Sequence, residues 1–224
     1  MSSKVKAWQG QPLPRGRHRL PREQVRASQR ERLLRAMAEV VSIEGYEATT
    51  VPKVVAAARV STNAFYEFFS DKTDCFLALC EQAGEELFAD LASFRDSPDW
   101  LTGLDRALEA CLRWWVDRRA LSIAYLVELP AAGRRAVEEK ERQHERFKVL
   151  MRWVGDRARR EQPELPPLTE VELDTAVSAA TEVVAREVRA GRLDSVPELR
   201  DDLRYLLVKL LANDATARRF RARE

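Results

Sequence analysis

The chain has 224 residues, of which 45% are apolar and 33% charged, so it can bury a sizeable core and is neither disordered nor collagen-like. The mean hydropathy is −0.42 and no run of about 18 apolar residues occurs, which excludes a membrane-spanning helix. Its three cysteines, Cys75, Cys80 and Cys111, have no metal-ligand spacing, and its first residues contain no apolar secretory segment. We therefore expect a protein of the reducing cytoplasm.

The net charge of +2 hides a strong asymmetry. Residues 1–35 contain ten Lys or Arg and two acids, whereas the remaining 189 residues carry a net charge of −6. A basic end on an acidic body predicts a tip that binds a polyanion, with residues 1–22 as a basic, flexible arm. Two alternatives are a solvated tail without a partner and an organellar transit peptide. Pro12, Pro14 and Pro21 disfavour the amphipathic helix that a transit peptide needs.

Apolar residues recur at helical spacing through most of the chain, and strand signals are nearly absent. An apolar stripe over 33–41 predicts the first helix, which should end at Gly45 because glycine readily adopts a left-handed conformation. Thr50 is suited to cap a short helix over 51–58. Asp71 is suited to cap the first of the longer helices that follow.

The longer helices are marked by capping residues and prolines. Ser97 precedes a proline and is suited to cap one of them, while Thr169 with Glu172 and Ser195 with Glu198 form capping-box patterns. The predicted ranges are 71–94, 97–115, 121–129, 131–160, 169–190 and 195–211. The sequence thus predicts about nine helices and no sheet, an all-α fold.

The three short helices near the N-terminus have the features of a helix-turn-helix. The turn needs an apolar plug, which Val60 can supply, and the third helix must begin with small polar groups that fit the major groove of DNA. Ser61, Thr62 and Asn63 meet this requirement, and Ser61 can also cap a helix that runs to about Phe69.

Several segments over residues 30–80 resemble the signature of TetR-type transcriptional regulators. They are Gly45-Tyr46-Glu47-Ala48-Thr49-Thr50-Val51, Ala58-Arg59-Val60-Ser61, Phe65-Tyr66, Phe69 and Lys72. The resemblance implies a homodimer with N-terminal helix-turn-helix domains, here 23–71, and a helical domain for ligand sensing and dimerisation, here 72–224. The sequence departs from the signature at Arg59, which replaces a turn glycine, at Val55, which replaces an alanine, and at Phe68, where a polar residue often contacts phosphate.

The resemblance, together with the chemistry of the residues, predicts a double-stranded DNA site. Asn63 is the natural bidentate partner of adenine, and a hydroxyl, an ammonium or a helix N-terminus can contact phosphate. The predicted DNA-binding residues are Thr50, Ser61, Thr62, Asn63, Tyr66 and Lys72, with Arg15, Arg17 and Arg19 of the arm as candidates for a minor groove. A loose tail near phosphates is an equal alternative for the arm.

The resemblance also predicts a pocket for a small hydrophobic or aromatic effector and a four-helix dimer interface built from the last two helices. The pocket candidates are bulky residues with a few polar anchors: Trp100, Cys111, Trp115, Tyr125, Glu128, His144, Phe147 and Met151. The dimer candidates are Val177, Ala180, Val184, Leu203, Leu207 and Leu210.

Other classes of function have less support in the sequence. The chain contains two histidines, His18 and His144, and no phosphate-binding loop, nucleophile elbow or zinc-protease motif, so we expect no enzyme, no cofactor and no metal. The alternative to a DNA-binding repressor is a helical adaptor that uses the last two helices without binding specific DNA. Sequence-specific retention on DNA would separate the two.

Overall fold

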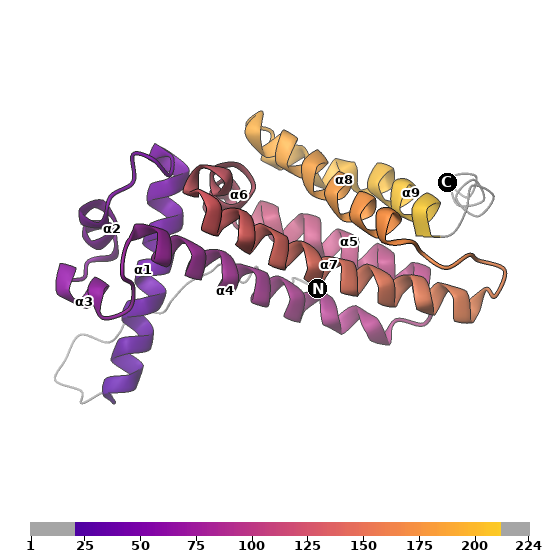
Figure 1. Ribbon diagram of the computed structural model, residues 1–224, viewed down its shortest axis with the longest axis horizontal. Helices are drawn as coiled ribbons and strands as arrows, with labels where there is room; N and C mark the ends of the chain where they lie inside the picture. The colour runs from indigo at the N-terminus through magenta and orange to yellow at the C-terminus, as the bar shows by residue number, and fades with distance from the viewer. Residues whose placement is uncertain (1–20, 212–224) are drawn as a thin grey trace, which may run out of the picture. The chain divides into compact units, whose positions relative to one another are not determined.

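The computed structural model describes residues 21–211, so the predicted arm contacts Arg15, Arg17 and Arg19 lie outside the described residues. The described part contains nine α-helices and no strand, which confirms the predicted all-α fold (Figure 1). By packing, the chain divides into two compact units. Among the described residues, the first comprises 21–83 and Asp117–Glu139, and the second comprises Gly84–Val116 and 140–211. These units are defined by how the residues pack and not by their function. The predicted boundary at residue 71, between a DNA-binding domain and a sensing domain, stays a prediction.

The first unit begins with α1 (Arg22–Glu44), α2 (Val51–Ala58) and α3 (Thr62–Tyr66). Both short helices pack against α1, as Figure 1 shows. Gly45 follows α1 with φ +81°, which confirms the predicted end of that helix. Ser61 caps α3 as predicted, because its Oγ accepts a hydrogen bond of 3.1 Å from the Ala64 amide.

Two local predictions in this unit need correction. Thr50 has the extended backbone of an N-cap residue, but its hydroxyl makes no capping hydrogen bond to α2. α3 ends at Tyr66 and not at Phe69, where the amide of Phe68 bonds back three residues to the carbonyl of Phe65 and so tightens the turn.

The first unit also contains the start of α4 (Lys72–Ala92), α6 (Arg119–Ile123) and the start of α7 (Arg134–Glu161). Asp71 caps α4 as predicted, since its Oδ1 accepts from the Asp74 amide at 2.8 Å. The helix predicted over 121–129 is interrupted. A π-helical turn (Ala124–Glu128) and a 3₁₀ turn (Leu129–Ala132) follow α6, because Pro130 cannot continue an α-helical ladder.

The second unit contains the end of α4, a 3₁₀ turn (Ser93–Asp96), α5 (Trp100–Asp117), most of α7, and α8 (Glu170–Arg189). The capping box of Thr169 and Glu172 forms as predicted. α5 is capped by Asp99, whose Oδ1 accepts from the Thr102 amide at 2.7 Å, and not by the predicted Ser97.

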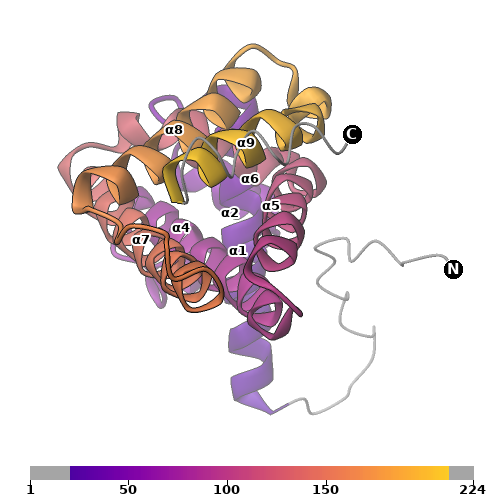
Figure 2. The same ribbon diagram turned by 90° about the vertical axis from the view of Figure 1, so that its right-hand side faces the viewer.

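The chain then continues through a 3₁₀ segment (Leu193–Leu199) to the last described helix, α9 (Arg200–Leu211), which lies beside α8 (Figures 1 and 2). The second predicted capping box, Ser195 with Glu198, is wrong. It falls inside the 3₁₀ segment, where Pro197 supplies no amide for an α-helical turn.

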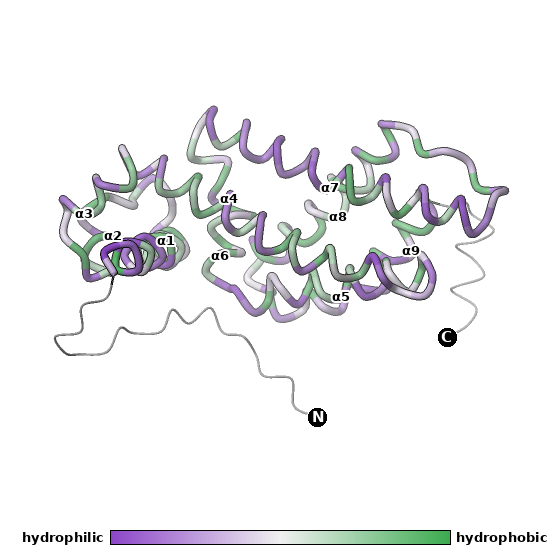
Figure 3. Tube along the Cα trace, turned by 90° about the horizontal axis from the view of Figure 1, so that it is seen from below, coloured by the Kyte–Doolittle hydropathy of each residue, from purple (hydrophilic) through white to green (hydrophobic). Residues whose placement is uncertain are grey.

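Charged side chains cover much of α7, which Figure 3 colours largely as hydrophilic. In the second unit they join it to α8. Lys148 Nζ lies 2.8 Å from Asp174 Oδ1 and 3.4 Å from Glu170 Oε2. The hydrogen bond from Lys148 lowers the pKa of Asp174.

The apolar stripes of α8 and α9 face the core of the second unit. Leu203 is 2% exposed and Leu207 5% exposed within the single chain, and Val177 and Val184 are equally buried. A side chain buried by its own chain has no surface left for a partner. Of the predicted dimer residues, only Ala180 and Leu210 keep partial exposure in the single chain, and the dimer interface stays a prediction. No helix in the range 21–211 is long and apolar enough to cross a membrane.

Candidate nucleic-acid interface

The recognition helix α3 presents its polar residues outward and its apolar residues inward. Phe65 is fully buried and Ala64 is 8% exposed, whereas Tyr66 is 56% exposed. Thr62 and Asn63 are exposed as well. The three side chains of α3 that are predicted to meet DNA are thus all exposed, and their contacts with DNA stay a prediction.

The predicted phosphate contacts lie around the turn that joins α1 to α2. Thr50 is exposed, and because its hydroxyl does not cap α2, both that hydroxyl and the first amides of α2 can face an anion. Lys53 in the first turn of α2 is held by Glu44 and by the Ala48 carbonyl, the latter at 2.9 Å.

Lys72 has a structural role that its sequence position did not indicate. Its Nζ donates to the carbonyls of Tyr46, Glu47 and Thr49 at 2.9, 3.1 and 3.0 Å. The ammonium also lies 4.5 Å from the centre of the Tyr46 ring. An ammonium has three N–H donors, and this geometry uses all of them. The predicted phosphate contact of Lys72 stays a prediction, and it would require one of these bonds to open.

The loop between α3 and α4 is anchored by Asp74. Its Oδ2 accepts from the amide and the hydroxyl of Ser70, both at 3.1 Å, and its Oδ1 pairs with Arg135 of α7 at 2.8 Å. The hydrogen bond from Arg135 is the main cause of the lowered pKa of Asp74. The position of α3 within the first unit therefore depends on Arg135, a residue far from α3 in the sequence.

Two arginines of α1, which the motif comparison did not single out, stabilise the helix-turn-helix. Arg26 lies 5.0 Å from the ring centre of Phe68 and pairs with Glu67 at 3.2 Å, just after α3. Arg32 donates to the carbonyl of Arg59 at 3.5 Å. Arg59 itself has φ +55°, the left-handed conformation expected where a glycine is replaced. In the sequence, the signal that could have indicated this role of Arg26 and Arg32 was the high density of arginine over residues 22–35.

The predicted effector residues fall into both units. In the second unit Trp100, Trp115 and Met151 are buried, and Phe147 packs on Phe88 at 4.6 Å between ring centres. Burial raises the pKa of Cys111 to about 12, so this thiol stays neutral at physiological pH.

The polar effector candidates are already engaged. His144 Nε2 lies 3.5 Å from the hydroxyl of Ser178 and 3.9 Å from Asp174. In the first unit, half-buried Tyr125 and Glu128 belong to the π turn, and Glu128 Oε2 accepts a hydrogen bond of 2.8 Å from the Tyr46 amide. Glu128 is thus bonded to the helix-turn-helix instead of being free for a ligand.

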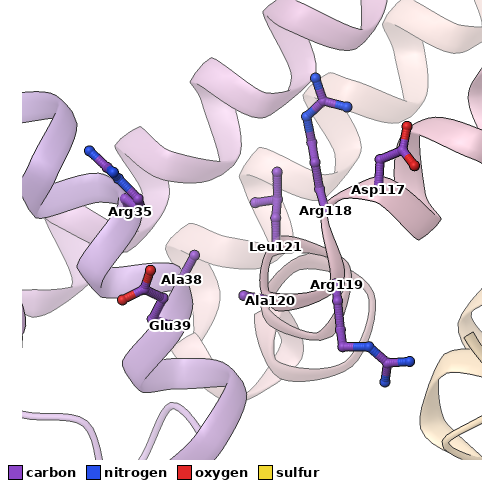
Figure 4. A pocket seen from close by; sticks show the side chains of 8 residues that line it. All are labelled: Arg35, Ala38, Glu39, Asp117, Arg118, Arg119, Ala120 and Leu121. Carbon is purple, nitrogen blue, oxygen red and sulfur yellow. The ribbon is translucent and has the colours of Figure 1, made fainter. Parts of the chain in front are cut away.

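A crevice of about 230 Å³ lies in the first unit, between α1 and the start of α6 (Figure 4). Its apolar floor includes Ala120 and Leu121, and its rim carries Arg118 and Arg119, which point to opposite sides. None of the eight predicted effector residues lines it. Its volume is below the ~300 Å³ lower bound for ligand pockets, so it is not the predicted effector site.

A helix-turn-helix with an exposed polar recognition helix defines a DNA-binding class of protein. In agreement, the sequence model of the family described as "Bacterial regulatory proteins, tetR family" matches residues 33–79. No curated protein matches the chain. The helix-turn-helix of this chain is that of a TetR-type transcriptional regulator, which confirms the resemblance seen in the sequence.

Solved structures of transcriptional regulators share the fold over most of the chain. The fatty acid degradation regulator FadR from Bacillus halodurans is 17% identical, with a TM-score of 0.73 over 80% of this chain and 94% of that one. FadR from Bacillus subtilis, solved in complex with stearoyl-CoA, is 15% identical, with a TM-score of 0.68 over 81% of this chain and 97% of that one. A TetR-like regulator from Rhodococcus sp. RHA1 is 23% identical, with a TM-score of 0.62 over 85% and 97%.

Proposed function

We propose that this protein is a dimeric, non-catalytic repressor that binds an inverted-repeat operator and releases it when a small effector binds. The observation that carries the proposal is the surface of α3. Thr62, Asn63 and Tyr66 are free at its exposed face, while Ala64 and Phe65 anchor it to the unit beneath. Small polar groups at the start of a recognition helix can approach base edges in the major groove.

Selection of bound sequences from random DNA tests this function directly. A two-fold symmetric protein selects an inverted repeat with half-sites about 34–36 Å apart or slightly more. With about four cationic phosphate contacts per subunit, the slope of log K against log salt is about −7 for the dimer. A pool that yields no common sequence, or binding that does not depend on salt, would refute the proposal.

The effector of this proposal is hydrophobic or aromatic. The second unit supplies the buried side chains of Trp115 and Met151, and the half-buried Phe147, whose ring packs on Phe88. Because FadR from Bacillus subtilis was solved with stearoyl-CoA, fatty acyl-CoA esters are the first compounds to test. Tryptophan emission, titrated beside operator retention, separates a ligand that binds and releases DNA from one that only binds.

The dimer of this proposal uses surfaces of α8 and α9 other than the buried stripe. Ala180 and Leu210 remain partly exposed, and Val171 is 73% exposed near the start of α8. Sedimentation of the full chain, with and without operator DNA, tests the dimer. A monomer that still selects an inverted repeat would show that dimerisation requires DNA.

A further inference from the structure

The turn over residues 45–49 connects α1 to α2, and side chains hold it from two directions. From α4, Lys72 donates to three of its carbonyls, and Thr73 Oγ1 shares a hydrogen bond of 2.8 Å with the Tyr46 hydroxyl. From the π turn that follows α6, Glu128 accepts from the Tyr46 amide. The position of α2, and of α3 packed on it, depends on this turn.

The Tyr46 amide needs an acceptor from outside α1. The Gly45 amide still bonds to the Val41 carbonyl, but the positive φ of Gly45 then turns the chain out of the helix. Tyr46 is 5% exposed, so water is a poor substitute for a protein acceptor. A carboxylate is the strongest acceptor that a side chain can offer to an amide.

Gly45 also leaves the space that the carboxylate occupies. A Cβ atom at this position would lie 3.3 Å from Glu128 Oε2, tighter than ordinary contact. Gly133 has the same φ of +81°, yet a Cβ atom there would meet nothing within 4 Å. The two glycines therefore share one backbone conformation and differ in whether a side chain would displace Glu128.

We infer that Glu128 is a positioning residue for DNA binding, which couples the segment after α6 to the orientation of α2 and α3 through the Tyr46 amide. This inference rests on the proposed function and names a regulatory connection within it. Glu128 is the last residue of the π turn, and π turns are wider than the α-helix by one residue. Closing the turn to α-helical geometry would rotate Glu128 by about 100° and withdraw it from the amide. The inference therefore assigns the change of state to this turn: an effector that favours α-helical geometry over the π turn would release the Tyr46 amide.

The glycine pair gives the sharpest experiment. Gly45→Ala and Gly133→Ala impose the same strain at positive φ, and only the first pushes on Glu128. We expect Gly45→Ala to raise the exchange rate of the Tyr46 amide about tenfold and to weaken operator binding about tenfold, with Gly133→Ala within about twofold of wild type in both. Equal effects of the two substitutions on amide exchange would overturn the inference.

Substitution of the carboxylate itself is the second arm. Glu128→Ala should reproduce the effects of Gly45→Ala, and Glu128→Gln, which keeps an oxygen acceptor, should restore most of the Tyr46 protection. Glu138→Ala is the control, because it removes an exposed carboxylate of the same unit that pairs with Arg134 on its own helix. Thermal unfolding of each variant separates a local effect from loss of the fold. An unchanged Tyr46 exchange rate in a folded Glu128→Ala variant would overturn the inference.

The two proposals fail in different ways. If wild-type protein selects no operator, the proposed function fails, although the exchange measurements still establish or remove the connection between Glu128 and Tyr46. If wild-type protein binds an operator and Glu128→Ala binds it equally well, with equal release by the effector, the function stands and the positioning role of Glu128 is refuted.

Discussion

The helix-turn-helix and the last two helices both carry clear sequence patterns. They differ in whether the side chains predicted to meet a partner are exposed in the folded chain. On α3 the residues predicted to face outward are exposed, and those predicted to face the core are buried. On α8 and α9 the apolar stripe predicted to meet a partner is buried by its own chain. A periodic pattern thus identifies the apolar face of a helix, and it does not identify what covers that face.

Leu203→Asp should give the largest effect among the substitutions that test this comparison. A charge placed at a side chain that is 2% exposed has no partner, so we expect a loss of about 4 kcal/mol or more in the free energy of unfolding. The half-buried Leu210 is the matched position, and Leu210→Asp should cost about 1–2 kcal/mol. Urea unfolding and sedimentation measure both. A Leu203→Asp variant that is monomeric and as stable as wild type would support the predicted interface at Leu203.

Lys72→Ala distinguishes a structural lysine from one that contacts phosphate. Loss of three charge-assisted hydrogen bonds should lower the free energy of unfolding by about 2–3 kcal/mol. The slope of log K against log salt should stay unchanged, whereas loss of a phosphate contact would reduce it by about 1. Lys53→Ala, at an exposed lysine of the same region, should cost less than about 1 kcal/mol. A flatter slope with unchanged stability would support the phosphate contact that the sequence predicts for Lys72.

Asn63→Ala tests the exposed face of α3. Because the side chain is exposed, the free energy of unfolding should change by less than about 0.5 kcal/mol. Discrimination between the selected operator and a mismatched one should fall by about 1–3 kcal/mol if the amide reads a base. Competition binding with matched and mismatched duplexes measures the difference. Equal weakening on every sequence would reassign Asn63 to a backbone contact.

The smallest expected effect concerns the charged surface between α7 and α8. The hydrogen bond from Lys148 lowers the pKa of Asp174, so this carboxylate stabilises the folded chain above its unfolded-state pKa of about 3.9. That contribution to stability is lost as the pH falls through the lowered pKa that Asp174 has in the folded state. Asp174→Asn should therefore be destabilising at pH 6 and neutral near pH 2. Urea unfolding at the two pH values measures the change in the free energy of unfolding. An equal loss of stability at both pH values would contradict this account.

Local chemistry in the sequence determined the helical elements and the helix-turn-helix. Gly45, Ser61, Asp71 and Thr169 end or cap helices as predicted, because a left-handed turn or a side-chain oxygen acts within a few residues of its own position. The outward face of α3 followed from the spacing of its aromatic residues by the same local logic.

Tertiary structure alone decided what each side chain contacts. Lys72 bonds to carbonyls about 25 residues away, and Glu128 bonds to an amide 82 residues away. Neither partner is visible in a local pattern, because the folded chain brings them together only after the helices have packed. For the same reason the stripe on α9 could not reveal that its own unit would bury it.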